Sequence, residues 1–264
     1  MATEPPEPEH TPFHDAELYD VLFSGLGFDR DFYLGLAREA GGPVLEVACG
    51  TGRILLPCLQ AGADVDGLDL FPEMLDVLRR KAAALGLSQG LAPRLHKADM
   101  RDFTLPRRYA LIIIPFNAFV HNLTTDDQLH ALRACRKHLA TGGVLVFNIF
   151  FPGREIICGP QGSPVLEHEA PHPVTGLPVR IYDTRSLDLV AQVQTSQVEI
   201  QELDAAGNVA ASHPSTTHMR WTYKPEMELL LQAAGFLRWQ ICGDFDRRPL
   251  TGDTDQMIVF AWKD

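Results

Sequence analysis

Two closely spaced glycines and a later acid in this sequence suit the binding of a nucleoside-like ligand. Gly50 and Gly52 lie between an apolar run, 43–49, and a segment of helical character. Backbone N–H groups in such a turn can converge on the anionic end of a ligand. Asp69 follows Gly50 by nineteen residues and closes the next apolar run. There its carboxylate can accept hydrogen bonds from a ribose diol at the edge of a sheet.

The same spacing argues against a dinucleotide ligand. Dinucleotide-binding proteins need a third small residue three positions after the second glycine, and this chain has Leu55 there. A nucleoside without a diphosphate is therefore favoured. Asp64 and Asp66 are alternatives to Asp69 as the ribose acid, but Asp69 stands at the end of its run.

These residues require a sheet whose strands end at a common edge. From residue 43, short apolar runs alternate with helical segments, which is typical of a parallel sheet built from β-α-β units. Thr124 and Asp127 resemble a capping box that opens a helix to about residue 138. The predicted strands are 43–49, 64–70, 94–100, 109–117 and 144–150, and the other predicted helices are 31–40, 53–62 and 72–86.

The pattern changes after residue 150. Residues 151–223 lose helical periodicity and indicate antiparallel strands with a turn at 204–208. We expect this β-rich insertion to be a lid over the site or the interface of a homodimer. The other expected parts are a disordered tail over 1–12, a cofactor-binding α/β core with an N-terminal helical cap over 13–150, and the end of that core over 224–264, with a helix at 225–235 and strands at 236–245 and 256–262.

Composition narrows the function classes. The 264 residues carry a net charge of −11, which repels a phosphate backbone, so we expect no nucleic-acid partner. No apolar run reaches the roughly eighteen residues that a membrane span needs, and the first residues do not resemble a signal peptide. Five scattered cysteines fit reduced thiols in the cytoplasm. The acids and histidines of 167–172 adjoin prolines that favour a loop, so we expect no metal site.

Four motifs of the chain resemble those of the class I S-adenosylmethionine-dependent methyltransferases. The resemblance covers about 40–150 and the last forty residues. It implies a Rossmann-like, doubly wound α/β sheet of seven strands, ordered 3-2-1-4-5-7-6 with strand seven antiparallel, and S-adenosyl-L-methionine as cofactor. The motifs are VLEVACGTGR (44–53), LDLFPEML (68–75), ADMRDF (98–103) and IIIPFNAFVHN (112–122).

The resemblance implies roles for individual residues. Asp69 is the ribose acid, Asp99 meets the adenine amino group and Met100 offers a backbone contact. Arg53 faces the carboxylate of the cofactor. Plain alternatives are that Asp99 caps a surface turn and that Arg53 is simply exposed to solvent. The expected cofactor-binding residues are Tyr33, Glu46, Ala48, Gly50, Gly52, Arg53, Asp69, Leu70, Met74, Asp99, Met100 and Phe116.

Glu46 and Tyr33 are cofactor candidates for separate reasons. Glu46 lies in an apolar strand, where an unpaired carboxylate is costly, so it needs a partner, such as a water near the amino group of the cofactor. Tyr33 is a further candidate for contact with the cofactor's carboxylate, although the amphipathic pattern of 31–40 explains it equally well.

Methyl transfer requires donor and acceptor to be held in line, and it requires a base only if the acceptor arrives protonated. His121, just beyond the fourth strand, is the expected base, and a loop histidine without chemistry is the alternative. Within the family, Leu18-Tyr19-Asp20 and the stretch from Phe116 to His121 resemble small-molecule N-methyltransferases that act on aminosugars and glycine-like amines. The resemblance therefore places Tyr19 and His121 at the acceptor.

The expected function is methylation of a small molecule at an amine nitrogen. Oxygen or carbon acceptors, a cofactor-binding protein without turnover and a nucleotide-dependent oxidoreductase are the alternatives. The run Ile114-Pro115-Phe116-Asn117 departs from the Asn/Asp-Pro-Pro-Tyr/Phe motif of DNA adenine and protein glutamine methyltransferases, which counts against nucleobase acceptors.

Thermal unfolding separates the methyltransferase from the oxidoreductase. S-adenosylmethionine at a hundred times its Kd should stabilise the protein by about 2.7 kcal/mol. NADH at the same concentration should leave the melting temperature unchanged. A rise with NADH alone would contradict the family resemblance.

Overall fold

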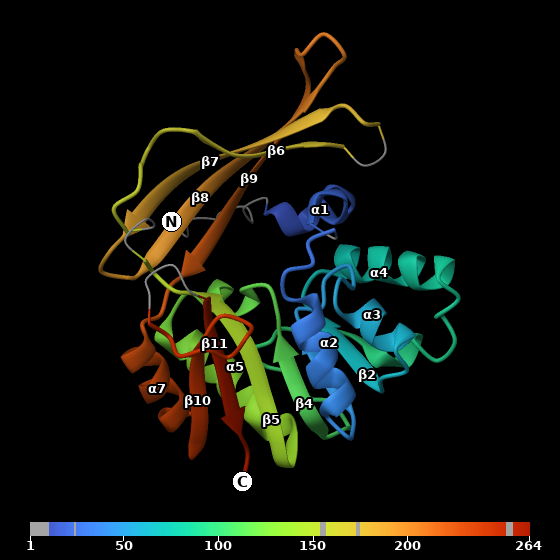
Figure 1. Cartoon of the computed structure of the whole chain (residues 1–264), viewed down its shortest axis with the longest axis vertical. Coiled ribbons are helices and arrows are strands. Elements are labelled where there is room, and N and C mark those ends of the chain that lie inside the picture. The colour runs from blue at the N-terminus through green and yellow to red at the C-terminus, as the bar shows by residue number, and fades with distance from the viewer. Residues whose placement is uncertain (1–10, 24, 154–156, 173–174, 252–255) are drawn as a thin grey trace, which may run out of the picture.

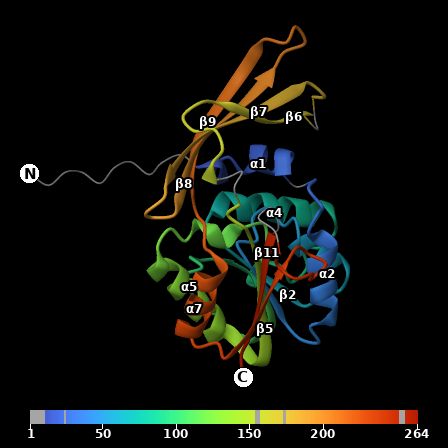
Figure 2. The same ribbon diagram turned by 60° about the vertical axis from the view of Figure 1, so that its left-hand side comes forward.

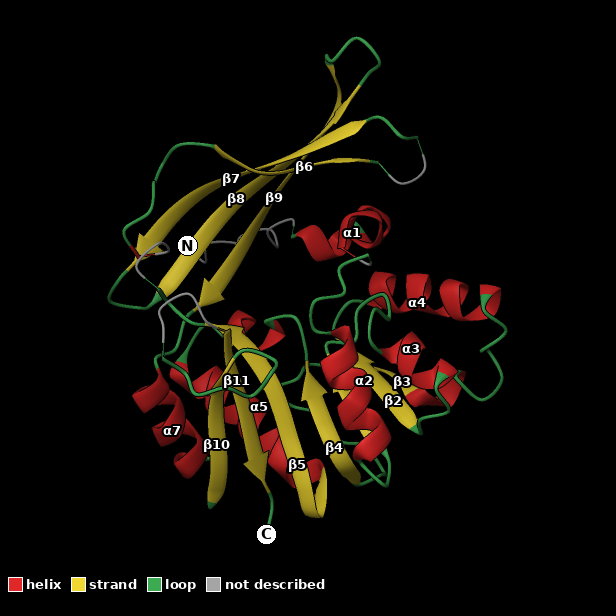
Figure 3. Cartoon of the chain, in the orientation of Figure 1, coloured by secondary structure: helices red, strands yellow, loops and turns green. Residues whose placement is uncertain are grey.

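The computed structural model describes the chain except for residues 1–10, 24, 154–156, 173–174 and 252–255. Its main layer is a seven-stranded sheet in the order β10-β11-β5-β4-β1-β2-β3 (Figures 1 and 3). β11 pairs antiparallel with β5 and β10, and the other neighbours are parallel. This confirms the order 3-2-1-4-5-7-6. The strands are β1 Val44–Val47, β2 Val65–Asp69, β3 Leu95–Lys97, β4 Tyr109–Ile114, β5 Leu139–Phe150, β10 Arg238–Gly243 and β11 Gln256–Trp262.

Helices cover both faces of this sheet, which explains why β1, β2 and β4 are almost entirely buried. One face packs against α2 Arg30–Glu39, α3 Leu55–Gln60 and α4 Pro72–Ala84. The opposite face packs against α5 Thr125–His138 and α7 Lys224–Ala233. The Thr124 hydroxyl accepts a hydrogen bond from the Asp127 N–H at 3.0 Å, so the predicted cap of α5 is confirmed.

A second, four-stranded antiparallel sheet is built from the inserted segment and stands over the main sheet (Figures 1 and 2). Its hairpin turn forms where expected, because the Asp204 carboxylate accepts hydrogen bonds from the N–H groups of Ala206 and Asn208. The strands are β6 Val165–Pro171, β7 Pro178–Asp188, β8 Val193–Leu203 and β9 Val209–Arg220.

The N-terminal segment fills the space between the two sheets. It forms a short 3-10 helix, η1 Pro12–His14, and then α1 Ala16–Phe23 (Figure 1). Leu18 packs against the apolar inner face of the second sheet. Lys81 of α4 forms an ion pair with Asp20 of α1 at 2.6 Å. The predicted disordered tail, 1–12, lies outside the described residues as far as residue 10, but Pro12 already belongs to η1.

Several predicted boundaries were wrong by a few residues. The third strand was expected over 94–100, but β3 ends at Lys97 because a tight turn follows, in which the Asp99 carboxylate accepts the Arg101 N–H at 2.8 Å. The first crossover helix was expected over 53–62, and α3 is shorter. The fifth strand begins at Leu139 instead of 144. Within the described residues, no helix has the length and apolar character to cross a membrane.

Gly67 of β2 permits the close packing of α3 on the main sheet. A Cβ atom there would lie 2.5 Å from Leu55 Cδ1 and 2.8 Å from Cys49 Sγ. Substitution Gly67→Ala should therefore overpack the core and lower the free energy of unfolding by about 1–3 kcal/mol. Urea denaturation measures the change. Gly35→Ala is the control, because a Cβ atom at this position of α2 meets no atom within 4 Å. It should stabilise the protein by about 0.5–1 kcal/mol. Equal stability of both variants would contradict this account.

Candidate functional site

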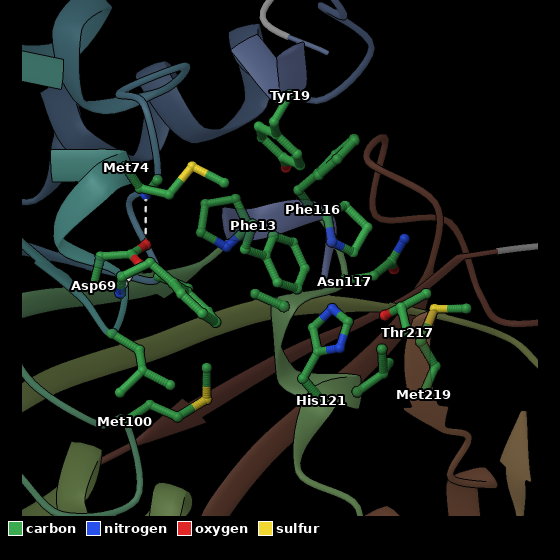
Figure 4. Close-up of a pocket in the computed structure, with 18 of the residues that line it drawn as sticks. Phe13, Tyr19, Asp69, Met74, Met100, Phe116, Asn117, His121, Thr217 and Met219 are labelled. Carbon is green, nitrogen blue, oxygen red and sulfur yellow. Dashed lines mark hydrogen bonds between the residues drawn. The ribbon is translucent and has the colours of Figure 1, made fainter. Parts of the chain in front are cut away.

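A cavity of about 440 Å³ lies between the carboxyl ends of the main-sheet strands and the inner face of the second sheet. Side chains from α1, the ends of β2 and β4, and β9 meet there (Figure 4). The position agrees with the rule that ligands of open α/β sheets bind beyond the carboxyl ends of the strands. The labelled residues fall into two groups on either side of Phe13: Asp69, Met74 and Met100 at one end, and Asn117, His121, Thr217 and Met219 at the other.

The carboxylate of Asp69 is held in place by backbone donors. One oxygen accepts the Gly50 N–H at 2.7 Å and the other accepts the Phe71 N–H at 2.9 Å. Burial raises the pKa of Asp69, and these hydrogen bonds act against the rise. Each carboxylate oxygen keeps a lone pair for a ligand hydroxyl. The Gly50 N–H was expected to face the anionic end of a ligand; instead it positions Asp69.

The alternatives to Asp69 have other partners. Asp66 accepts a hydrogen bond from the Tyr109 hydroxyl at 2.8 Å, and Asp64 forms an ion pair with Arg94 at 2.6 Å. Of these three acids, all in the described part of the chain, Asp69 lines the cavity.

The two glycines of the turn have different roles. Gly50, at φ +51°, lines the cavity beside Ala48, which also has a positive φ of 57°. Gly52 lies behind the turn, where a Cβ atom would lie 2.9 Å from Leu56 Cγ. The structure therefore shows a packing role for Gly52 and does not bring it to the cavity lining.

A smaller cavity of about 40 Å³ adjoins the turn and contains a buried carboxylate. Glu46 lines it, and its Oε2 atom has no hydrogen-bond partner among the described residues. Burial raises the pKa of Glu46 well above its usual value. An ammonium group bound in this cavity would supply the partner that the sequence argument requires for Glu46.

Arg53 also lines the smaller cavity, and it is not exposed to solvent as the alternative supposed. Its guanidinium forms two hydrogen bonds to the buried Asp29 carboxylate, of 2.5 and 2.7 Å, and one to the Leu26 carbonyl. It also lies 4.6 Å from the ring centre of Phe116, which lines both cavities. Asp29 was missed because its pairing with Arg53 spans 24 residues and follows no sequence pattern.

Asp99 lines the main cavity and caps a turn at the same time, so both interpretations of it have a basis. Arg101 donates to its carboxylate at 2.6 and 3.0 Å, which lowers the pKa of Asp99. Arg101, missed by sequence reasoning, also contacts Asp127 at 3.1 Å. Leu70, Met74 and Met100 add apolar surface to this end of the cavity.

At the opposite end, His121 presents a defined tautomer to the cavity. Its Nδ1 lies 3.0 Å from the backbone carbonyl of His218 in β9. A carbonyl oxygen only accepts, so Nδ1 carries the hydrogen and Nε2 keeps its lone pair. Desolvation lowers the pKa of His121, which favours this neutral form. The Phe13 ring packs edge-on against the imidazole, with ring centres 5.2 Å apart.

Tyr19 of α1 lines both cavities and contacts the rings of Phe13 and Phe23. Enclosure in this apolar cluster raises the pKa of Tyr19. Its hydroxyl therefore stays protonated at neutral pH and is a hydrogen-bond donor and not a base.

Tyr33 does not reach either cavity. It is fully buried in α2, and its hydroxyl donates to Asn148 Oδ1 at 2.8 Å. Asn148 donates in turn to Asn117 Oδ1 at 3.0 Å. Two amide side chains thus connect the Tyr33 hydroxyl to the lining of the cavity. Asn117 lines the cavity in a left-handed conformation, with φ 60°.

In the described part of the chain, no group of three His, Cys, Asp or Glu side chains could hold a metal ion. The acids of 167–172 have other partners, because Glu167 pairs with Arg185 and Glu169 with Arg180.

Known proteins resemble both the sequence and the fold. Residues 44–143 match a family model described as a methyltransferase domain. A dTDP-3-amino-3,4,6-trideoxy-alpha-D-glucopyranose N,N-dimethyltransferase from Streptomyces venezuelae is 32% identical over 139 residues, which cover 50% of this chain and 55% of the relative. The chain thus spans about half the length of this relative.

Two solved structures extend the likeness to nearly the whole chain. The CcbJ methyltransferase from Streptomyces caelestis has a TM-score of 0.76 at 21% identity and covers 95% of this chain and 97% of its own. The S-adenosylmethionine-bound amino pentose methyltransferase CalS10 from Micromonospora echinaspora has a TM-score of 0.70 at 23% identity, with 94% and 97% covered. At these identities the likeness establishes the fold.

Loss of the Asp69 carboxylate should weaken cofactor binding. Asp69→Asn removes charge-assisted hydrogen bonds worth about 1.5–3 kcal/mol, so the Kd for S-adenosylmethionine should rise about 10- to 100-fold. Calorimetric titration measures this change. The control, Asp76→Asn, alters an exposed acid of α4 that pairs with Arg79 and should keep the original affinity. An Asp69→Asn variant that binds as tightly as the original protein would remove Asp69 from the site.

Proposed function

We propose that this protein transfers a methyl group from S-adenosyl-L-methionine to an amine nitrogen of a small molecule. The class I methyltransferase fold and the match of residues 44–143 to a methyltransferase domain support the proposal. The observation that carries the amine assignment is the neutral imidazole of His121, whose Nε2 is free to accept a proton at one end of the cavity. At the other end, the carboxylate of Asp69 can hold a ribose.

The donor set fits the cofactor along its length. The unpartnered Oε2 of Glu46 suits the ammonium group. The guanidinium of Arg53 beside it keeps two of its five N–H donors after those to Asp29 and Leu26, and these suit the carboxylate. Asp69 suits the ribose hydroxyls. Asp99, with the apolar side chain of Met74 nearby in the cavity, suits the adenine and its amino group. When bound, the cofactor supplies the sulfonium methyl group that is transferred.

His121 would receive the proton that an amine must lose before it attacks. A free alkylamine is protonated at neutral pH, with a pKa near that of lysine, about 10. Entry into an apolar cavity lowers that pKa, because desolvation disfavours the charged form. The proton would pass from the ammonium nitrogen to His121 Nε2 and leave the nitrogen lone pair free. The His218 carbonyl of β9 would fix the imidazole during this step.

Tyr19 would help to orient the acceptor. Its hydroxyl stays protonated, so it can donate a hydrogen bond without competing for the proton of the amine. Because Tyr19 lies on α1 and His121 follows β4, the N-terminal segment would complete the acceptor side of the cavity.

We also infer a cytoplasmic setting. All five cysteines are free thiols, and four of them are buried. This arrangement suits a reducing compartment. The net charge of −11 suits a small-molecule acceptor better than a nucleic acid.

Replacement of His121 should affect turnover and not cofactor binding. His121→Asn should lower kcat about 10²- to 10⁴-fold, as expected for loss of a general base, and leave the Kd for S-adenosylmethionine unchanged. S-adenosylhomocysteine formation gives the rate. The control is His130→Asn, an exposed histidine of α5, which should keep the full rate.

The pH dependence of the rate shows whether His121 is a base or only lines the cavity. Because the pKa of His121 is lowered, the imidazole is neutral at pH 7, and the rate should fall only as the pH drops below its ordinary value of about 6.5. In the His121→Asn profile this limb should be replaced by a rise toward alkaline pH that follows the pKa of the amine itself, because the variant has no base to take the proton. A variant with the full rate, or one whose rate falls at the same pH as that of the original protein, would refute the role of His121 as the base.

A further inference from the structure

Apolar side chains from the N-terminal segment and the second sheet line the main cavity. Phe13 and Phe23 come from the N-terminal segment, and Val198, Ile200 and Met219 come from β8 and β9. We refer to these five residues as the apolar wall. Phe13 and Met219 lie on either side of His121 in Figure 4. An acceptor nitrogen placed at His121 would therefore bring the body of its molecule against this wall.

Charge in the cavity is predominantly negative. Asp69 and Asp99 line it, and the one cationic side chain among the described lining residues is Arg101. That guanidinium is already paired with Asp99 and Asp127. A diphosphate at the acceptor end would lose its hydration against apolar side chains, and the described lining residues offer no unpaired cationic side chain to compensate for that loss.

The second sheet does not change this balance in its described residues. Its arginines are paired with acids: Arg180 with Glu169, Arg185 with Asp183 and Glu167, and Arg220 with Glu226.

Two neutral polar side chains adjoin the apolar wall. Asn117 Oδ1 accepts a hydrogen bond from Asn148, so the amide N–H groups of Asn117 remain as donors. Thr217 of β9 lines the cavity two residues before Met219, and Figure 4 shows both near His121. An amide donor and a hydroxyl can bind one uncharged oxygen beside the amine, such as a hydroxyl or an ether.

We propose that the acceptor is an amine on an apolar, phosphate-free body, bound against the apolar wall with one uncharged oxygen near Asn117 and Thr217. This inference rests on the proposed function and narrows its substrate class. The Streptomyces venezuelae relative is named for a dTDP-linked aminosugar, whose diphosphate this cavity disfavours. If the acceptor is an aminosugar, the methyl group would be added to a sugar that no longer carries a nucleotide.

Two probes with the same aminosugar test the proposal. One is an octyl glycoside of 3-amino-3-deoxyglucose, and the other is the dTDP derivative of that sugar. Each is titrated calorimetrically into the full-length protein, with and without S-adenosylhomocysteine. The octyl glycoside should bind at least about tenfold more tightly, a difference of about 1.4 kcal/mol. Equal or tighter binding of the dTDP sugar, or no saturable binding of the octyl glycoside, would overturn the proposal.

Variants of the wall show whether it is the surface that binds. Met219→Lys places an ammonium group in the wall. It should weaken the binding of the octyl glycoside by at least about tenfold and strengthen the binding of the dTDP sugar. Met219→Leu keeps the wall apolar and should keep the preference for the octyl glycoside over the dTDP sugar. Val198→Lys repeats the test from β8, in case Met219→Lys unfolds the chain. A folded lysine variant that binds the octyl glycoside as tightly as the original protein would refute the role of the wall.

Binding of S-adenosylhomocysteine tests the proposed function independently of the acceptor. Absence of S-adenosylhomocysteine binding would contradict the methyltransferase assignment, whereas the probe titrations without cofactor would still decide the nature of the acceptor.

Discussion

The hydrogen bond from the Gly50 N–H to the Asp69 carboxylate is the contact on which the site depends. The hydrogen bond is 2.7 Å long and joins the turn after β1 to the end of β2. The second oxygen of Asp69 is held by the Phe71 N–H at the start of α4. One carboxylate thus aligns the turn, the strand end and the helix that border the cavity. Its burial is tolerable only because backbone donors compensate for lost water.

The second physical constraint is that the surroundings of His121 come from two separate sheets. His121 belongs to the segment after β4, but the carbonyl that fixes its tautomer belongs to β9 of the second sheet. The N-terminal segment links the two, since Leu18 packs on the second sheet and Asp20 pairs with Lys81 of α4. The acceptor end is therefore assembled from parts that no single strand or helix carries, while the cofactor end belongs to the main sheet.

Sequence reasoning predicted the features that depend on local pattern. The strand order followed from the family resemblance, the cap of α5 from Thr124 and Asp127, and Asp69 from its place at a strand end. Each depends on residues close in the chain or on a motif of fixed spacing. Gly52 was part of such a motif, but the same glycine serves helix packing equally well, so spacing alone could not separate the two roles.

What could not be predicted depends on contacts between distant residues. The pairing of Arg53 with Asp29 and the hydrogen bond of Tyr33 to Asn148 join segments with no shared periodicity. Thr217 and Met219 reach the cavity because tertiary packing places β9 against the segment that follows β4. An alternating strand pattern does not predict which residues the inner face of the strand contacts.

A crystal structure of the protein with S-adenosylhomocysteine tests the central claim most directly. The account predicts ribose hydroxyls on Asp69, the amino group at Glu46 and the sulfur atom facing the acceptor end where His121 lies. A nucleoside bound elsewhere, or one turned so that its sulfur lies away from His121, would contradict it.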